Sequence, residues 1–318
     1  MYDVIALGEL LIDFASKSAD ADGYPTMAAN PGGAPGNFLA ALNAYGKKTA
    51  FLGKVGDDAF GHLLLGTLNR AGIETRGILV DPTVFTTLAF VTFDESGDRS
   101  FSFARKPGAD TQIFWEEVDK TMIDQAKIFH FGTLSLTGEP ARTTTQKCVA
   151  YAKAQGKLIT CDPNLRKPLW ATMEEAKEQI LWSLHQADVV KISDEEVEFL
   201  WGCTPEEGAQ KLLTECGVSL AMVTLGPKGC LLKTANAVCT VPGPKVSPID
   251  TTGAGDIFGG SAVSRLLDLG KDIAELTDAD LEFIGSFATT AASLSTEVLG
   301  GIPSIQEKEV VLKRMQSL

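Results

Sequence analysis

The residues with the clearest chemical potential form the run 250–256, which reads DTTGAGD. Apolar residues repeat with a helical period directly after it, so a loop should become a helix at Gly253, Ala254 and Gly255. The first N–H groups of a helix have no partner within it and carry partial positive charge. Because the side chains here are small, an anion can approach these groups closely. The run therefore predicts an anion site at the start of a helix.

The carboxylate of Asp256 bears on what this site does. A bound phosphate would repel it, so Asp256 does not suit a passive phosphate cradle. It suits a reaction in which Asp256 takes a proton from a hydroxyl that attacks phosphorus, while the N–H groups hold the charge that develops on the transferred group. The alternative is a turn of small residues in which Asp256 is only a charge in the first turn of a helix.

A second unusual run covers residues 30–37 (NPGGAPGN) and holds three glycines and two prolines. This composition is not expected inside a helix or a strand, so a tight turn is predicted, followed by a helix over 38–46 that Gly46 ends. Asn37 then lies at or near the first turn. Its side chain can donate and accept hydrogen bonds, and so could bind a polar ligand. The alternative is that Asn37 is an ordinary N-cap.

The elements that position these runs alternate between strand and helix, which favours a parallel sheet. The helix over 57–69 should turn Leu63, Leu64, Leu65 and Leu68 inward. The predicted strands cover 3–7, 49–56, 127–131, 157–162, 189–192 and 220–224, and further helices cover 139–155, 174–185 and 278–296.

Residues 86–105 break this alternation. Two β-rich segments flank a turn at 94–98, so they predict a hairpin that stands outside the main sheet as a lid or an interface. Phe101 and Phe103 share one face of it and are expected to pack. Arg105 ends the hairpin, where it could clamp a substrate or solvate the strand end.

Polar residues near the ends of other strands are further candidates for binding. Asp13 could accept bonds from sugar hydroxyls or be a solvated charge, and Arg166 follows a strand end, where open α/β sheets place ligands. The cluster SDEE at 193–196 precedes a helix. It could cap that helix, with Ser193 as N-cap, or Glu196 could help to hold Mg²⁺.

Composition excludes several classes of protein. The 318 residues carry a net charge of −13 without a basic run, which argues against binding nucleic acid or anionic membrane. Neither a membrane-spanning apolar run nor a signal peptide is expected, and the six cysteines never form C-x-x-C, so a cytoplasmic protein is predicted. Motifs for P-loop enzymes, dinucleotide-binding oxidoreductases and G-x-S-x-G hydrolases are missing. His62, His130 and His185 are isolated, and each is expected on the surface or in the core.

Taken together, the two glycine-rich runs resemble the signatures of the PfkB (ribokinase-like) carbohydrate kinase family. Residues 32–37, with Gly46 and Gly56 at the family's spacing, resemble its N-terminal signature, and 250–256 its C-terminal one. The resemblance covers essentially the whole chain. It implies a single domain over 1–318 with a three-layer α/β/α sandwich, a mainly parallel central sheet and a small β-sheet lid formed from about 10–31 and 75–106. Leu39 and Ser261 depart from the usual small residues, which concerns helix packing only.

The resemblance also implies roles for individual residues in ATP-dependent phosphorylation of a hydroxyl. Asp256 matches the catalytic base, and 253–255 match the anion hole. The positions matched to the substrate are Asp13, Gly32, Gly33, Asn37, Phe103, Arg105 and Arg166. Those placed at ATP are Lys191, Ser193, Glu196, Thr224, Gly226, Gly229 and Thr289. Glu196 would hold Mg²⁺ indirectly, and Asp250 and Thr252 match a monovalent-cation site for an ion such as K⁺.

Within the family, the segment 101–110 (FSFARKPGAD) is most similar to the lid of fructokinases. The resemblance thus implies phosphorylation of D-fructose to D-fructose 6-phosphate. Two alternatives are kept: a kinase for another substrate, such as 2-keto-3-deoxygluconate, aminoimidazole riboside or another nucleoside, and a sugar-binding regulator without catalytic activity. The face of the lid could also pair two copies into a homodimer.

Overall fold

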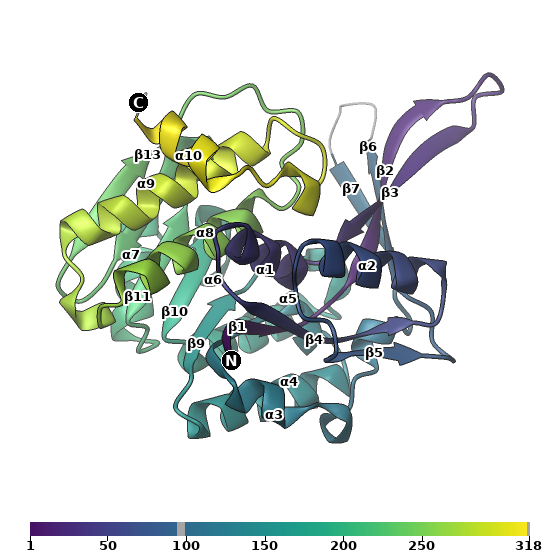
Figure 1. Cartoon of the computed structure of the whole chain (residues 1–318), viewed down its shortest axis with the longest axis horizontal. Helices are drawn as coiled ribbons and strands as arrows, with labels where there is room; N and C mark the ends of the chain where they lie inside the picture. Colours follow the sequence, from purple (N-terminus) through teal and green to yellow (C-terminus); the bar gives the residue numbers. More distant parts are fainter. Residues whose placement is uncertain (94–98, 317–318) are drawn as a thin grey trace.

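The computed structural model describes residues 1–93 and 99–316, and its main feature is a nine-stranded sheet (Figure 1). From β5 to β11 the neighbouring strands run parallel, and β12 and β13 continue the sheet antiparallel. In spatial order the strands are β13 (Val238–Pro242), β12 (Gly229–Lys233), β11 (Leu220–Thr224), β10 (Val189–Ser193), β9 (Leu158–Asp162), β8 (Ala126–Gly132), β1 (Tyr2–Leu7), β4 (Thr49–Gly56) and β5 (Ile78–Asp81).

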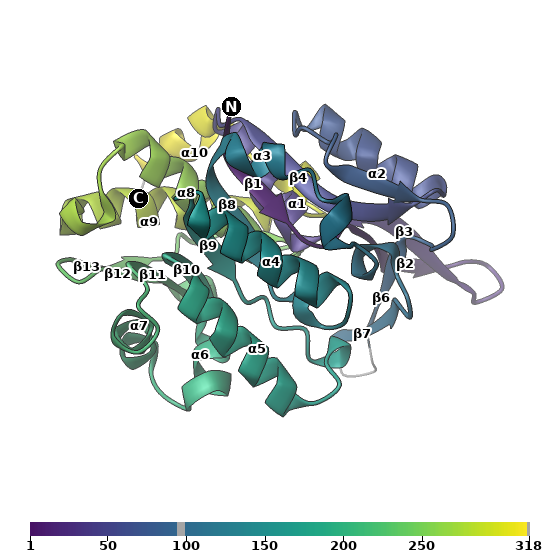
Figure 2. The same cartoon turned by 90° about the horizontal axis from the view of Figure 1, so that it is seen from below.

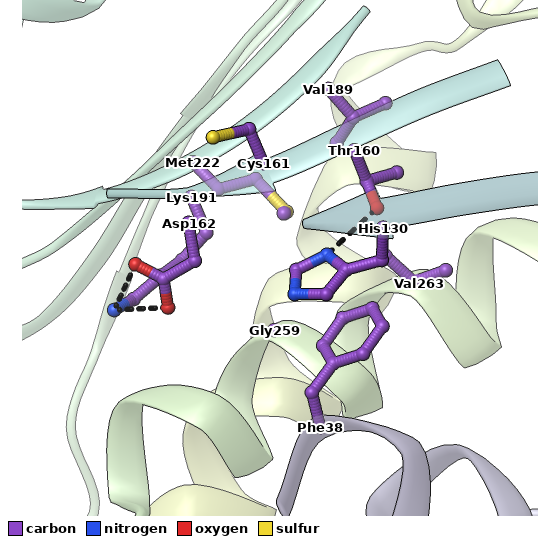
Figure 3. Close-up of a pocket in the computed structure, with 10 residues that line it drawn as sticks. All are labelled: Phe38, His130, Thr160, Cys161, Asp162, Val189, Lys191, Met222, Gly259 and Val263. Carbon is purple, nitrogen blue, oxygen red and sulfur yellow. Dashed lines mark hydrogen bonds and ion pairs between the residues drawn. The ribbon is translucent and has the colours of Figure 1, made fainter. Parts of the chain in front are cut away.

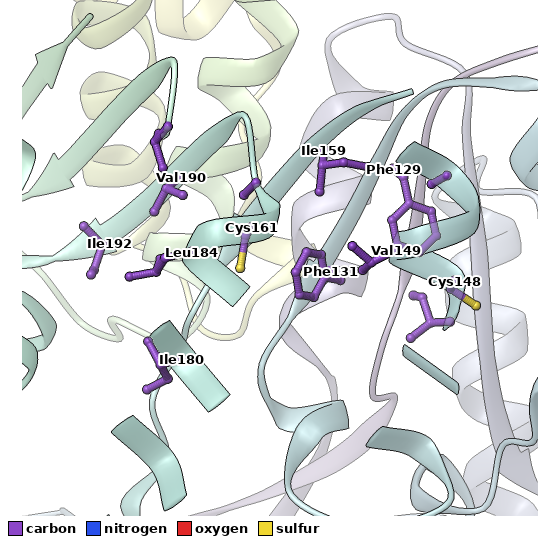
Figure 4. Close-up of a cluster of buried hydrophobic side chains, with 14 of the residues drawn as sticks. Phe129, Phe131, Cys148, Val149, Ile159, Cys161, Ile180, Leu184, Val190 and Ile192 are labelled. Carbon is purple, nitrogen blue, oxygen red and sulfur yellow. The ribbon is translucent and has the colours of Figure 1, made fainter. Parts of the chain in front are cut away.

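Helices cover both faces of this sheet, as the view from below shows (Figure 2). One face packs against α3 (Lys120–Asp124), α4 (Ala141–Ala154), α5 (Met173–Gln186), α6 (Asp194–Trp201) and α7 (Pro205–Thr214). The other packs against α1 (Ala34–Ala44), α2 (Ala59–Arg70), α8 (Ala254–Leu269) and α9 (Asp278–Ser295), and α10 (Lys308–Met315) packs on the helices of this layer. The central strands are apolar because both of their faces are buried. Phe129 and Phe131 of β8 are buried on the face that α4 and α5 cover (Figure 4). The predicted three-layer α/β/α sandwich is confirmed.

A second, four-stranded sheet projects from one end of the molecule (Figure 1). Its spatial order is β3 (Pro25–Gly32), β2 (Leu11–Ala19), β6 (Thr87–Phe93) and β7 (Arg99–Ala104). The predicted lid began too early at residue 75, because β5 pairs with β4 in the large sheet instead. The predicted turn at 94–98, and the side chain of Phe101, lie outside the described residues.

The run 30–37 folds differently from its prediction as a plain turn. Pro31 and Gly32 lie in β3, which tolerates proline because it is an edge strand with one unpaired side. Helix α1 already begins at Ala34, since Pro35 occupies the first turn, where its missing N–H costs nothing. Gly33 is the N-cap with φ 113°, a conformation that favours glycine.

The structure differs from the prediction in two further details. Leu63 is 37% exposed on α2, whereas Leu64 and Leu68 are buried, so the apolar stripe is narrower than predicted. Helix α7, which Thr204 caps, was not predicted at all. Seven 3₁₀ turns, η1 (Ala109–Thr111), η2 (Trp115–Glu117), η3 (Leu134–Leu136), η4 (Lys167–Leu169), η5 (Gly226–Lys228), η6 (Ile273–Glu275) and η7 (Ile302–Ser304), complete the described elements. None of the helices in the described chain is both long and apolar enough to cross a membrane.

Candidate active site

The predicted anion site lies at the start of α8. Gly253 is its N-cap with φ 76°, and Ala254, Gly255 and Asp256 form the first turn. Within the described residues, the backbone N–H groups of Gly255 and Asp256 have no hydrogen-bond partner. A Cβ at position 253 would lie 3.0 Å from the Cα of Gly301, so glycine permits both the turn and this close approach. The start of α8 thus has the backbone geometry that an anion site requires, and anion binding there stays a prediction.

Asp256 is half-buried beside these N–H groups and is held by Asn37 of α1. The Nδ2 of Asn37 donates to Oδ2 of Asp256 over 2.9 Å. Burial raises the pKa of Asp256, while the bond from Asn37 and the charges of Lys191 and Arg166 oppose the rise. A carboxyl with a raised pKa beside an anion site can accept a proton from a substrate hydroxyl.

Asn37 is not the N-cap of its helix, which excludes one of the two explanations given for it. Its side chain is buried at 4% exposure, and its Oδ1 has no hydrogen-bond partner among the described residues. Buried amide oxygens are normally paired. Asn37 can thus hold Asp256 with its nitrogen and still accept a hydrogen bond from a ligand with its oxygen.

Asp13 reaches the same region from β2 of the small sheet. Its Oδ2 would lie 2.2 Å from a Cβ at position 32, so Gly32 leaves the space that this carboxylate needs. Burial raises the pKa of Asp13 to about 6, and the charge of Arg166 opposes this rise. Arg166 acts on the pKa of both Asp13 and Asp256, so the two carboxylates and the guanidinium are near one another.

Beneath α8 lies a buried ion pair between Lys191 of β10 and Asp162 of β9 (Figure 3). The Nζ of Lys191 is 3.0 Å from Oδ2 of Asp162, and 2.8 Å from where a Cβ at Gly255 would be. Burial alone would lower the pKa of Lys191, but the charges of Asp162, Glu196 and Asp256 raise it above its ordinary value. Lys191 therefore stays charged directly below the anion site.

Asp162 was noted in the sequence only as the end of a strand. The sequence signal available for Asp162 was its position at the end of a predicted strand, because open α/β sheets place ligands at the carboxyl ends of their strands. In the structure this strand, β9, lies two strands from the edge of the parallel region. Burial raises the pKa of Asp162 to about 6, and Lys191 opposes the rise. A small cavity next to Asp162 and Lys191 is also lined by His130, which stacks on Phe38 with ring centroids 3.7 Å apart. Of the two positions expected for this histidine, surface or core, the structure shows the core.

The cluster at 193–196 caps α6, as one of its two explanations proposed. Ser193 Oγ accepts from the N–H of Glu196, and Glu196 Oε2 accepts from the N–H of Ser193. The other oxygen, Oε1, accepts from the N–H of Leu165 over 2.7 Å. Both oxygens of Glu196 thus accept hydrogen bonds from the protein. With this geometry, Glu196 would contact Mg²⁺ through a bridging water and not directly.

The residues predicted to contact ATP lie along the ends of β10 to β12 and on α9. Thr224 ends β11, and Gly226 has φ 56° in the turn after it. Gly229 has φ 105°, and a Cβ there would lie 1.9 Å from the carbonyl oxygen of Val241, so this glycine lets β13 approach β12. Thr289 of α9 is buried and its Oγ1 donates to the sulfur of Cys230 over 3.2 Å.

Asp250 and Thr252, the predicted monovalent-cation residues, form a bonded loop before α8. Oδ1 of Asp250 accepts from the N–H and the hydroxyl of Thr252, at 2.9 and 2.6 Å. Its Oδ2 accepts from the N–H of Gly300 at 2.9 Å. In the part of the chain that the structure describes, no group of three or more His, Cys, Asp and Glu side chains is placed to hold a metal ion.

Arg105 does not solvate a strand end, which excludes one of its two explanations. It is buried at 8% exposure, and its guanidinium bonds to Asp110, to Oγ1 of Thr137 and to the carbonyl of Leu134. None of these hydrogen-bond partners belongs to the group around Asp256. Phe103 is half-buried on β7, where it lies opposite Ala89.

An α/β sandwich in which the carboxylate of Asp256 lies at the start of a helix, and in which a second sheet brings Asp13 to the same region, has the features expected of a small-molecule phosphotransferase. The family model described as pfkB family carbohydrate kinase matches residues 1–308. The chain belongs to this family.

Relatives in sequence and solved structures support this family assignment. Fructokinase-2 of Solanum lycopersicum is 40% identical over 95% of this chain and 92% of its own length. Probable fructokinase-4 of Arabidopsis thaliana is 40% identical over 97% and 95%. The crystal structure of fructokinase with bound ATP from Xylella fastidiosa superposes with a TM-score of 0.90, at 29% identity over 100% and 99% of the two chains. Fructokinase from Vibrio cholerae O395, bound to fructose, ADP and calcium ion, gives 0.86, at 31% identity over 98% of each chain.

Proposed function

We propose that this protein is a fructokinase that transfers a phosphoryl group from ATP to D-fructose, at the hydroxyl on carbon 6. The observation that carries the proposal is the carboxylate of Asp256, held by Asn37 beside the unpaired N–H groups that begin α8. The relatives named as fructokinases support the choice of sugar.

The chemistry follows from the groups on either side of the reacting atoms. Asp256 accepts the proton of the attacking hydroxyl, and its raised pKa brings it closer to the pKa of a useful general base. The N–H groups of Gly255 and Asp256 and the ammonium of Lys191 stabilise the charge on the transferred group, where positioning and electrostatics supply most of the rate. The free Oδ1 of Asn37 and the carboxylate of Asp13 accept bonds from other sugar hydroxyls.

The nucleotide and its metal would bind at the ends of β10 to β12. Thr224, Gly226, Gly229 and Thr289 would contact the nucleotide, together with Ser193, which ends β10 beside Thr224, and Glu196 in the first turn of α6. Mg²⁺ supplies charge neutralisation on the phosphates when it is bound, and Glu196 would hold it through water. Asp250 and Thr252 would hold a monovalent cation such as K⁺ near the loop that precedes α8.

The four-stranded sheet acts as a lid that closes over the sugar and excludes water from the transferred group. Its exposed face also pairs two copies of the chain into a homodimer. Light scattering at micromolar concentration tests the dimer, and a monomeric mass would refute it.

The proposed function is tested by ADP release from MgATP with a panel of acceptors. D-fructose should give the highest kcat/KM, and the product should be D-fructose 6-phosphate. Higher kcat/KM with 2-keto-3-deoxygluconate or a riboside would assign another substrate within the family. If no acceptor stimulates ADP release although fructose binds in calorimetry, the chain is a sugar-binding regulator.

A further inference from the structure

The small sheet joins the body of the molecule where β2 and β6 begin and where β3 and β7 end, and buried polar groups tie these points together. Glu9, at 2% exposure just before β2, accepts the N–H of Ala34, just after β3, over 2.8 Å. Thr87, fully buried at the start of β6, donates to Oδ1 of Asp110 over 2.5 Å. Arg105, just after β7, donates to Oδ2 of the same carboxylate from Nε and from a terminal nitrogen, at 2.9 and 2.6 Å.

Asp110 is therefore a single buried carboxyl group, at 3% exposure, that joins the start of β6 to the end of β7. The guanidinium extends this connection to the body, because it also donates to the carbonyl of Leu134 and to Oγ1 of Thr137, around η3 after β8. Charge-assisted hydrogen bonds between a guanidinium and a carboxylate are short and strong, and a buried pair is costly to break by removing one partner. The connection thus holds the small sheet in one orientation.

The hydrogen-bonded group of Thr87, Arg105 and Asp110 lies close along the strands to Asp13, the candidate sugar-binding carboxylate. Asp13 on β2 lies opposite Ala89 on β6, and Ala89 lies opposite Phe103 on β7. Thr87 and Arg105 are each two residues away from this row. Thr87 begins β6 and Arg105 directly follows β7, so by the alternation of extended chain both are expected on the same face as the row. A shift at Thr87 or Arg105 is passed directly to Asp13, because strands in a bonded sheet move together.

We propose that Arg105 and Asp110 are positioning residues that set the small sheet, and with it Asp13, over the reacting atoms at Asp256. Arg105 acts through Asp110 and does not bind the sugar. The proposal rests on the proposed function for its kinetic consequence, but the effect on the sheet itself does not.

The test compares Arg105→Gln, Asp110→Asn and the double variant in the full-length protein. Each single variant should raise the KM for fructose about tenfold or more, with the KM for ATP within about twofold of wild type, and should raise ADP release without sugar as water enters. The double variant should be no worse than the more impaired single variant, because both changes break one connection. Thr87→Val, which removes one hydroxyl bond only, keeps the test open if Asp110→Asn fails to fold; it should raise the KM for fructose about threefold.

Arg265→Gln is the matched control, because Arg265 is also a buried guanidinium paired with one carboxylate, that of Asp268. It should lower stability and leave the KM for fructose unchanged. A readout without substrate is amide hydrogen exchange, which should become faster across β2 and β6 in Asp110→Asn.

The proposal is overturned if Asp110→Asn and Thr87→Val leave both the KM for fructose and exchange in β2 at wild-type values while Arg105→Gln raises the KM, since Arg105 would then bind the sugar itself. If wild type shows no sugar-dependent ADP release, the proposed function fails, and the exchange result alone decides whether the connection positions the sheet.

Discussion

Asp256→Asn separates the chemical role of this residue from any structural one. The substitution keeps the shape of the side chain, and the new amide oxygen can still accept the hydrogen bond that Asn37 donates over 2.9 Å. What it removes is the ability to accept a proton. Loss of a general base lowers kcat by about 10²–10⁴-fold, which corresponds to about 3–5 kcal/mol of transition-state stabilisation. The KM for ATP should change little, since nucleotide binding does not need the carboxylate.

The free energy of unfolding of Asp256→Asn should not fall together with kcat. Burial raises the pKa of Asp256 above that of the unfolded chain, so the ionised carboxylate opposes folding at every pH above its folded pKa. At pH 8 the variant should therefore have a free energy of unfolding equal to or greater than that of wild type. A group kept at the expense of stability is typical of a functional site.

The measurement combines steady-state kinetics of ADP release with urea denaturation of the same preparations at pH 8. A kcat within about fivefold of wild type would refute the assignment of Asp256 as general base, since a base contributes at least about 10²-fold. A large fall in stability with little change in kcat would instead favour the explanation that Asp256 is only a charge in the first turn of α8.

Three further predictions concern the same site. First, kcat/KM for fructose should fall as the pH drops through the pKa of Asp256, with the acid limb above the ordinary carboxyl range because burial raises this pKa; a flat profile down to pH 4 would contradict this. Second, Gly301→Ala puts a Cβ 2.3 Å from Oδ1 of Asn37, so it should displace this side chain from Asp256 and lower kcat/KM about tenfold, measured at unchanged far-UV circular dichroism. Third, Lys191→Met should lower kcat about 10–100-fold, whereas Lys54→Met, which removes another buried ion-paired lysine, should leave kcat within about twofold; equal effects would remove Lys191 from the anion site.

Much of this molecule could be predicted from local patterns along the chain. The alternation of apolar strands and amphipathic helices predicted the parallel sheet, since both signals arise from neighbours within a few residues, and the resemblance of the two glycine-rich runs to a known family implied the sandwich. The start of α8 was predictable for the same reason: its N-cap needs a positive φ, and small side chains leave its N–H groups open, which are properties of residues 253–255 alone. The cap formed by Ser193 and Glu196 is equally local.

Contacts between distant parts of the chain were decided by the tertiary structure. Asn37 and Asp256 are 219 residues apart, and only the packing of α1 against α8 brings them within a hydrogen bond. Arg105 pointed to a sugar contact as a sequence position, but the fold buries its guanidinium against Asp110. Proline at position 31 lies in a strand because that strand is at the edge of its sheet, a property that depends on the order of strands in space. Periodicity records which face of an element is buried, but it does not record which element covers that face.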